Sequence, residues 1–160
     1  MSIERVRAYL EPLGMADKIL EFPVSSATVE LAAQALGCEG ARIAKTLSFL
    51  VEGQPVLIVA AGDAKIDNSK YKAFFHTKAK MLTPDEAEEL VGHAVGGVCP
   101  FGVKEGVTVY LDESLKRFHT VFPACGSSNS AIELTIPELE RLSGYTAWVD
   151  VCKNWAKEDL

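Results

Sequence analysis

The feature that most constrains the fold is a pair of short apolar runs near the middle of the chain. Residues 47–51 and 56–60 are mostly apolar, and Glu52-Gly53-Gln54-Pro55 lies between them. Runs of this length on either side of turn-forming residues are typical of two buried strands joined by a tight turn. The sequence therefore predicts a hairpin in the core of the protein.

Helices are predicted on both sides of this hairpin. Apolar residues recur at helical spacing over residues 2–12, and again over 29–36, where Gly37 closes the helix. Asp67 can cap a helix that reaches about residue 75. A clearer start is Thr83-Pro84-Asp85-Glu86, a capping box that opens a helix to about residue 91.

Further strands are expected in the second half of the chain. Apolar and polar residues alternate over 107–111 and 132–136, and residues 147–151 are expected to form a last strand. Thr135 and Glu138 predict one more amphipathic helix. Because helices and strands are interspersed without regular β-α-β spacing, the predicted class is α+β, with helices packed on a mixed or mostly antiparallel sheet. The chain is expected to form one domain over residues 1–160.

Composition places the protein among ordinary globular chains. It has 160 residues, 48% hydrophobic and 24% charged, and no apolar run approaches the roughly 20 residues that cross a bilayer. A charged N-terminus argues against a signal peptide, so the cytoplasm is the expected location. Scattered cysteines favour free thiols over a disulfide framework or a zinc site; they are Cys38, Cys99, Cys125 and Cys152.

Charge is distributed unevenly along the chain. The net charge is −6, but the segment from Asp63 to Lys80 carries +3, which leaves −9 for the rest. The overall charge argues against a protein that coats DNA or other nucleic acid. The basic segment could meet a phosphate backbone at one place, or it could be a solvated lysine face. Its lysines include Lys65, Lys70 and Lys72.

Several catalytic motifs are missing. The sequence contains neither a G-x-S-x-G elbow nor an H-E-x-x-H metal helix. Residues 40–46 approach the phosphate-binding P-loop pattern, but Ala44 stands where the second glycine is required. We therefore expect neither a metal site nor a cofactor.

Three other features can carry chemistry. Lys45 enters a buried strand, so its ammonium either snorkels to the surface or meets an anionic partner. Gly96-Gly97-Val98-Cys99-Pro100-Phe101-Gly102 is either a structural turn or a loop that presents backbone amides to a carbonyl oxygen or anion. Gly126-Ser127-Ser128-Asn129-Ser130 either turns the chain or hydrogen-bonds a ribose or terminal base.

In this order along the chain, these features resemble the YbaK/ProX family. The family includes free-standing aminoacyl-tRNA deacylases and the editing domain inserted in some prolyl-tRNA synthetases. The matching segments are 35–37, 43–47, 96–102, 112–115, Gly126 and 132–134.

The resemblance implies a curved sheet with flanking helices and a cleft for the aminoacylated 3′ end of tRNA. It implies that Lys45 is the main functional side chain and that Gly96 to Pro100 hold the aminoacyl group through their backbone. It also implies substrate-assisted hydrolysis without a metal or a protein nucleophile. Mischarged tRNA is then the substrate, and prolyl-tRNA synthetase is a possible partner.

Departures from the family pattern bear on specificity. Cys99 stands where relatives often have serine or threonine, Ala131 where some have aspartate, and residues 127–129 replace a more basic stretch. At position 46 the sequence has threonine, as the deacylases that act on cysteinyl-tRNA(Pro) do. By this resemblance we expect the misattached amino acid to be a small one, such as cysteine or alanine.

On this hypothesis the glycine-loop amides of Gly96 and Gly97 orient the carbonyl, and Lys45 holds the terminal phosphate or ribose. Two alternatives remain open: a non-catalytic module that binds an aminoacyl or nucleotide ligand, and a thiol hydrolase that uses Cys99 as nucleophile.

Overall fold

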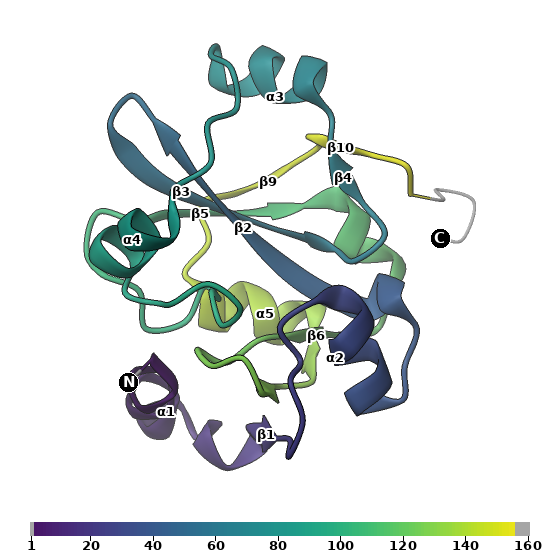
Figure 1. Ribbon diagram of the computed structural model, residues 1–160. Helices are drawn as coiled ribbons and strands as arrows, with labels where there is room; N and C mark the ends of the chain where they lie inside the picture. Colours follow the sequence, from purple (N-terminus) through teal and green to yellow (C-terminus); the bar gives the residue numbers. More distant parts are fainter. Residues whose placement is uncertain (1, 156–160) are drawn as a thin grey trace.

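A six-stranded mixed sheet forms the centre of the computed structural model, which describes residues 2–155 (Figure 1). Its strands lie in the order β8 (Leu134–Thr135), β6 (Thr120–Pro123), β2 (Ile43–Val51), β3 (Gln54–Ala61), β5 (Thr108–Asp112) and β9 (Ala147–Val149). Two short ladders accompany it, β1 (Leu20–Glu21) with β7 (Ser130–Ala131) and β4 (Lys65–Ile66) with β10 (Cys152–Lys153). Four of the seven strand pairings in this part of the chain are antiparallel and three are parallel. The predicted α+β class and mixed sheet are confirmed.

The helices surround this sheet. In Figure 1, α3 lies at its upper edge, whereas α1, α2 and α5 lie below it and α4 lies to one side. Their bounds are α1 (Ser2–Leu10), α2 (Val29–Leu36), α3 (Asn68–Phe75), α4 (Pro84–Glu86) and α5 (Ile136–Ser143). Short 3-10 turns are η1 (Glu11–Leu13), η2 (Ala16–Lys18), η3 (Gly40–Arg42) and η5 (Glu113–Arg117), and η4 (Ala87–Val91) is a π-helical turn. Within residues 2–155, no helix combines the length and hydrophobicity needed to cross a bilayer.

The predicted hairpin is the longest ladder of the sheet. Strands β2 and β3 pair over eight positions, from Ala44 with Ala61 to Val51 with Gln54. The connection is shorter than the sequence indicated, because Glu52 (φ 50°) and Gly53 (φ 79°) alone form the turn. Two successive residues at positive φ match the right-handed twist of the flanking strands.

The predicted helix starts are confirmed by their capping bonds. Thr28, Asp67, Thr83 and Thr135 each accept hydrogen bonds from backbone N–H groups of the first helical turn. Both capping boxes form, with Glu86 and Glu138 bonding back to the capping residue. Local sequence is sufficient here because a cap involves residues that are only three positions apart.

Some predicted bounds are wrong. The first helix ends at Leu10 and tightens into η1, where Pro12 interrupts the α-helical bonding. Of the predicted strand 132–136, only Leu134 and Thr135 form a strand, β8, which pairs with β6, and Ile136 already begins α5. The separate strand β7, which pairs with β1, ends before it at Ala131. The last strand stops at Val149, where the chain leaves β5.

Two apolar clusters position the site. The larger one joins the buried residues of β3 and β5 to Leu139 and Leu142 of α5, all fully buried apart from strand ends. The smaller one consists of Ala32, Ile43 and Phe122 and fastens α2 onto β2 and β6. This second cluster fixes α2 over one end of β2, where the candidate site lies.

Candidate functional site

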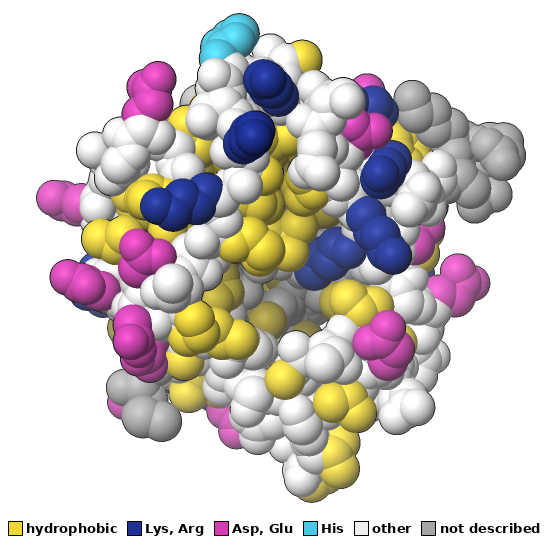
Figure 2. Space-filling model, turned by 45° about the horizontal axis from the view of Figure 1, so that its top comes forward, with side chains coloured by type: hydrophobic (Ala, Val, Ile, Leu, Met, Phe, Trp, Pro, Cys, Tyr) yellow, Lys and Arg dark blue, Asp and Glu magenta, His cyan; other side chains and the backbone are white. Residues whose placement is uncertain are grey.

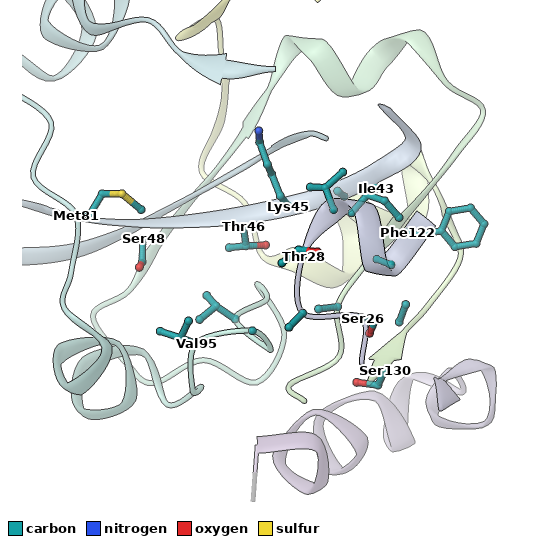
Figure 3. A pocket seen from close by; sticks show the side chains of 18 of the residues that line it. Ser26, Thr28, Ile43, Lys45, Thr46, Ser48, Met81, Val95, Phe122 and Ser130 are labelled. Carbon is teal, nitrogen blue, oxygen red and sulfur yellow. The ribbon is translucent and has the colours of Figure 1, made fainter. Parts of the chain in front are cut away.

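A cavity of about 230 Å³ opens beside β2. The space-filling view shows a hollow near the middle of one face, with apolar side chains around its mouth and a basic border (Figure 2). Figure 3 shows its walls, which come from α2, β2, the 95–98 loop and the ends of β6 and β7. The lining residues used below are Ser26, Ala27, Thr28, Val29, Lys45, Thr46, Ser48, Met81, Leu82, Val95, Gly96, Val98, Ser130 and Ala131.

Lys45 lies at the edge of this cavity. It is half-buried, and Figure 3 shows its side chain leaving β2 on the opposite side from Thr46 and Ser48. Its ammonium donates to the carbonyl of Ala64 and, at 3.4 Å, to that of Gly62. An ammonium has three donors, so one remains for a ligand. The lysine therefore neither snorkels freely nor meets an anionic side chain.

The turn that holds this ammonium is itself fixed. Asp63 accepts two hydrogen bonds from Arg117, at 2.9 and 2.5 Å, and the Arg117 side chain is almost completely buried. A carbon added at Gly62 would lie 2.0 Å from the carbonyl oxygen of Gly40. The two carbonyls are thus part of a rigid turn, which sets the place of the Lys45 ammonium.

Burial lowers the pKa of Lys45, and the nearby Lys65 lowers it further. The charges of Asp63 and Glu30 act in the opposite direction but do not offset the loss of solvation. An ammonium in this state is poorly hydrated, so a phosphate or ribose oxygen would compete with little water for it.

The edge of β2 is open beside Thr46. On this edge β6 pairs only with Ile43 and Ala44, and segment 80–82 bonds Ser48 and Leu50. Because the backbone groups of an antiparallel strand alternate in direction, Thr46 points its N–H and C=O toward the same edge as Ser48 and Leu50. The Thr46 hydroxyl is also buried without a partner among the described residues. The two main-chain groups of Thr46 are thus left for an occupant of this gap.

The glycine loop is divided between the cavity and the structure around it. Gly96 and Val98 line the cavity together with Lys45 and Thr46, and within residues 2–155 their backbone N–H groups find no protein acceptor. The N–H of Gly97 instead donates to the carbonyl of Ala94 at 3.0 Å. Of the two amides predicted to orient a carbonyl, that of Gly97 is thus already bonded within the loop, whereas that of Gly96 is not.

Gly97 has a packing reason to be glycine. A carbon added there would lie 2.5 Å from the backbone of Gly126 and Ser127. The 96–102 and 126–130 segments, which are far apart in sequence, thus pack backbone against backbone. Gly126 lies at this contact and does not line the cavity.

The remaining residues of the two loops lie away from the cavity. Cys99, Pro100 and Phe101 are buried beneath it, and Gly102 packs against Arg5 and Tyr9 of α1. Ser128 and Asn129 accept backbone hydrogen bonds from Ser26 and Phe22, at 2.6 and 2.8 Å. They fasten the segment before α2, whereas the neighbouring Ser130 and Ala131 reach the cavity.

Cys99 is in a poor environment for a nucleophile. Its thiol is fully buried, and burial raises its pKa to about 12. His93 Nε2 lies 3.6 Å from the sulfur and 2.7 Å from the carbonyl oxygen of Phe101. Since a carbonyl only accepts, Nε2 must carry the proton and cannot take one from the thiol. Burial also lowers the pKa of His93, which favours the neutral ring.

If the chain hydrolyses aminoacyl esters, we therefore expect Cys99→Ser to do so at a rate within about threefold of the parent, since a buried thiol that does not react is replaced by a group of similar size. Deacylation of charged tRNA, measured before and after iodoacetamide, tests this. Near-complete loss of activity in the variant, or in the alkylated parent, would instead support the hypothesis that the protein is a thiol hydrolase.

The three predicted tRNA-contacting lysines differ in their surroundings. Lys70 is bound to Asp150 at 3.0 Å and to the carbonyl of Cys152 at 3.1 Å, so it ties α3 to the C-terminal strand. Lys65 and Lys72 are exposed and form no ion pair within the described residues.

Sequence reasoning missed much of the cavity wall. Ser26, Ser48, Met81 and Val95 give no motif, because each only becomes a wall residue through contacts across the fold. Gly62 could have been suspected, since Ala60-Ala61-Gly62 is a run of small residues at the end of a buried strand. In the part of the chain that the structure covers, no three His, Cys, Asp or Glu side chains gather at one point as metal ligands would.

Comparison with known proteins gives a consistent picture. A family model described as "Aminoacyl-tRNA editing domain" matches residues 24–142, which include the whole cavity wall. The chain is 56% identical to the uncharacterized protein YwhH of Bacillus subtilis, over 97% of this chain and 99% of that protein. It is 29% identical to a proline–tRNA ligase of Geobacillus, over 74% of this chain but only 20% of the much longer ligase.

Two solved structures are similar over nearly the whole fold. A crystal structure titled as a "putative trans-editing enzyme for prolyl tRNA synthetase" superposes with a TM-score of 0.85 at 34% identity, over 95% of this chain and 97% of that one. The hypothetical protein APE2540 superposes with a TM-score of 0.82 at 26% identity, over 93% and 99%. With the family model spanning most of the chain, the protein belongs to the aminoacyl-tRNA editing domain family.

Proposed function

We propose that the protein is a free-standing deacylase that hydrolyses the ester bond of mischarged tRNA, with tRNA(Pro) carrying a small amino acid as its substrate. The observation that supports this proposal is that Lys45 and Thr46 line one cavity together with Gly96 and Val98, which are far from them in sequence. Such a substrate is met in the cytoplasm, so we expect the protein there.

The size and wall of the cavity favour a small amino acid. About 230 Å³ lies below the usual range of pockets for drug-sized ligands. Small apolar side chains form much of the wall, including Ala27, Val29 and Ala131. The Thr46 hydroxyl has no protein partner among the described residues. On this proposal it forms a hydrogen bond with the thiol, the hydroxyl or the α-amino group of the bound amino acid.

The polar groups suit the two ends of the ester. On this proposal the amides of Gly96 and Val98 orient the aminoacyl carbonyl and stabilise the negative charge that develops on its oxygen. The third donor of Lys45 then binds the ribose or the terminal phosphate. An aminoacyl ester is already reactive toward hydrolysis. Holding a water molecule in position to attack the ester carbonyl is therefore sufficient for useful catalysis.

A panel of charged tRNAs tests the proposal. The protein is incubated with tRNA(Pro) carrying radiolabelled alanine, cysteine, serine or proline, and loss of label is followed. We expect at least one of the three smaller amino acids to be released about tenfold faster than proline, which corresponds to a discrimination of about 1.4 kcal/mol. Binding of every tRNA without release would instead identify a non-catalytic module.

A further inference from the structure

A second cavity lies next to the first and has a different chemistry. It has a volume of about 380 Å³ and is formed by Asn68, Ser69, Lys72, Lys78 and Ala79. We propose that this cavity, here called the lysine cavity, binds a phosphate group, and that in the substrate complex the group belongs to the RNA strand that leads to the terminal nucleotide. The second part of this proposal rests on the proposed function.

The residues that line the lysine cavity are two lysines, an asparagine, a serine and an alanine, and none of the five is acidic. Lys72 and Lys78 are exposed and, within residues 2–155, neither has a carboxylate partner. A phosphate offers several charged acceptors to such a set, and charge-assisted hydrogen bonds are the strongest available.

The nearest acidic groups are already engaged. Asp67 caps α3 by accepting from the amides of Ser69 and Lys70, at 2.9 and 3.1 Å. Asp150 is paired with Lys70 at 3.0 Å. The side chains of Asn68 and Ser69 have no protein partner in the described chain. Lys72 and Lys78 thus bring two unpaired positive charges to this cavity.

One extended segment connects the lysine cavity to the candidate site. Lys78 and Ala79 line the former, and Met81 and Leu82 line the latter. Backbone hydrogen bonds hold this segment against β2. The N–H of Leu50 donates to the carbonyl of Lys80, and the N–H of Leu82 donates to the carbonyl of Ser48. Four residues span at most about 14 Å, a distance that a short single strand of RNA can cover. Figure 2 shows basic side chains gathered on the same half of this face, beside the hollow.

The test compares two substrates that share the ester but differ in phosphate. The double variant Lys72→Ala with Lys78→Ala is assayed on aminoacyl-tRNA and on 3′-aminoacyl-adenosine, which has no phosphate. For the tRNA we expect KM to rise about tenfold, kcat to stay the same and the dependence of log(kcat/KM) on log[salt] to become shallower by about 0.7, the value for one phosphate contact to a single strand. For aminoacyl-adenosine we expect no change.

A matched control removes two lysines elsewhere. Lys18, in η2, and Lys104, which donates to the carbonyl of Glu89, are suitable for this control. Neither residue lines the candidate site or the lysine cavity. Lys18→Ala with Lys104→Ala should leave KM for the tRNA within about twofold of the parent. An equal rise in both double variants would mean a general charge effect, and equal losses on both substrates would mean a structural role; either result would overturn the proposal.

A binding measurement separates this proposal from the proposed function. Inorganic phosphate is titrated into the parent and the Lys72/Lys78 variant while backbone amide shifts are followed by NMR. We expect saturable shifts at Asn68 and Ser69 in the parent alone, whether or not the protein hydrolyses any ester. Absence of such shifts in the parent would overturn the phosphate site and leave the deacylase untouched.

Discussion

Replacing Lys45 by alanine is expected to lower kcat/KM for mischarged tRNA by about 100-fold while the protein stays folded. The lysine makes no ion pair that the core depends on, and its ammonium is held by two carbonyls at the cavity mouth. The loss should therefore come from a misplaced substrate. Single-turnover deacylation gives the rate, and thermal unfolding shows whether the fold persists. A variant as fast as the parent would remove Lys45 from the site.

Two further lysine variants refine this result. Lys45→Met keeps the apolar stem and removes the charge, so it should lose as much activity as Lys45→Ala. Lys45→Arg keeps the charge, but its planar guanidinium cannot place its donors as an ammonium does, and we expect partial activity.

The pH dependence follows from the lowered pKa of Lys45. The protonated form is the one that can hold a phosphate or ribose oxygen, and burial makes it lose its proton below the ordinary lysine pKa of about 10.4. Affinity should therefore fall as pH rises and should do so earlier than for an exposed lysine. A non-hydrolysable analogue with an amide in place of the ester allows this to be measured at alkaline pH. In Lys45→Arg the alkaline fall should disappear.

The second large effect is expected for Gly97→Ala. Its new methyl group would lie 2.5 Å from backbone atoms of Gly126 and Ser127, so the two loops would have to separate. We expect the free energy of unfolding to fall by about 1–3 kcal/mol, and kcat/KM to fall by about 100-fold because Gly96 and Val98 move with the loop. Urea unfolding and the deacylation assay measure the two effects.

Gly40→Ala is the matched control for this variant. Its added methyl group would meet only a Val29 side-chain carbon, at the ordinary distance of 3.4 Å, and neither glycine has a positive φ. It should leave both quantities near the parent values. If Gly97→Ala were as stable and as active as Gly40→Ala, the close contact of the two loops would be required neither for stability nor for activity.

The parts of the fold that could be predicted are those decided by neighbours in sequence. The hairpin turn needs only Glu52 and Gly53, and each helix cap needs residues within three positions. The two-residue strands β1, β4 and β10 give no such signal, because each exists only through a partner more than 80 residues away.

The candidate site shows the same division. Lys45 and the glycine loop were found because unusual residue types mark them, a lysine entering a core strand and glycines in a cluster. The reason that Gly96 and Val98, and not Gly97, have free amides lies in a turn closed by Ala94, which no spacing rule reveals. The partners of Lys45 were also hidden, since Gly62 and Ala64 reach it only after β2 and β3 have paired.

The gap along β2 links recognition to stability. At Thr46 the central sheet lacks two main-chain hydrogen bonds, one to the N–H and one to the C=O, that a neighbouring strand would otherwise supply. An occupant that makes these bonds would complete the sheet, and it would do so only in the folded protein. Its binding free energy would then be added to that of folding, so the unliganded protein would be the less stable form and the bound ligand would act as a temporary part of the sheet.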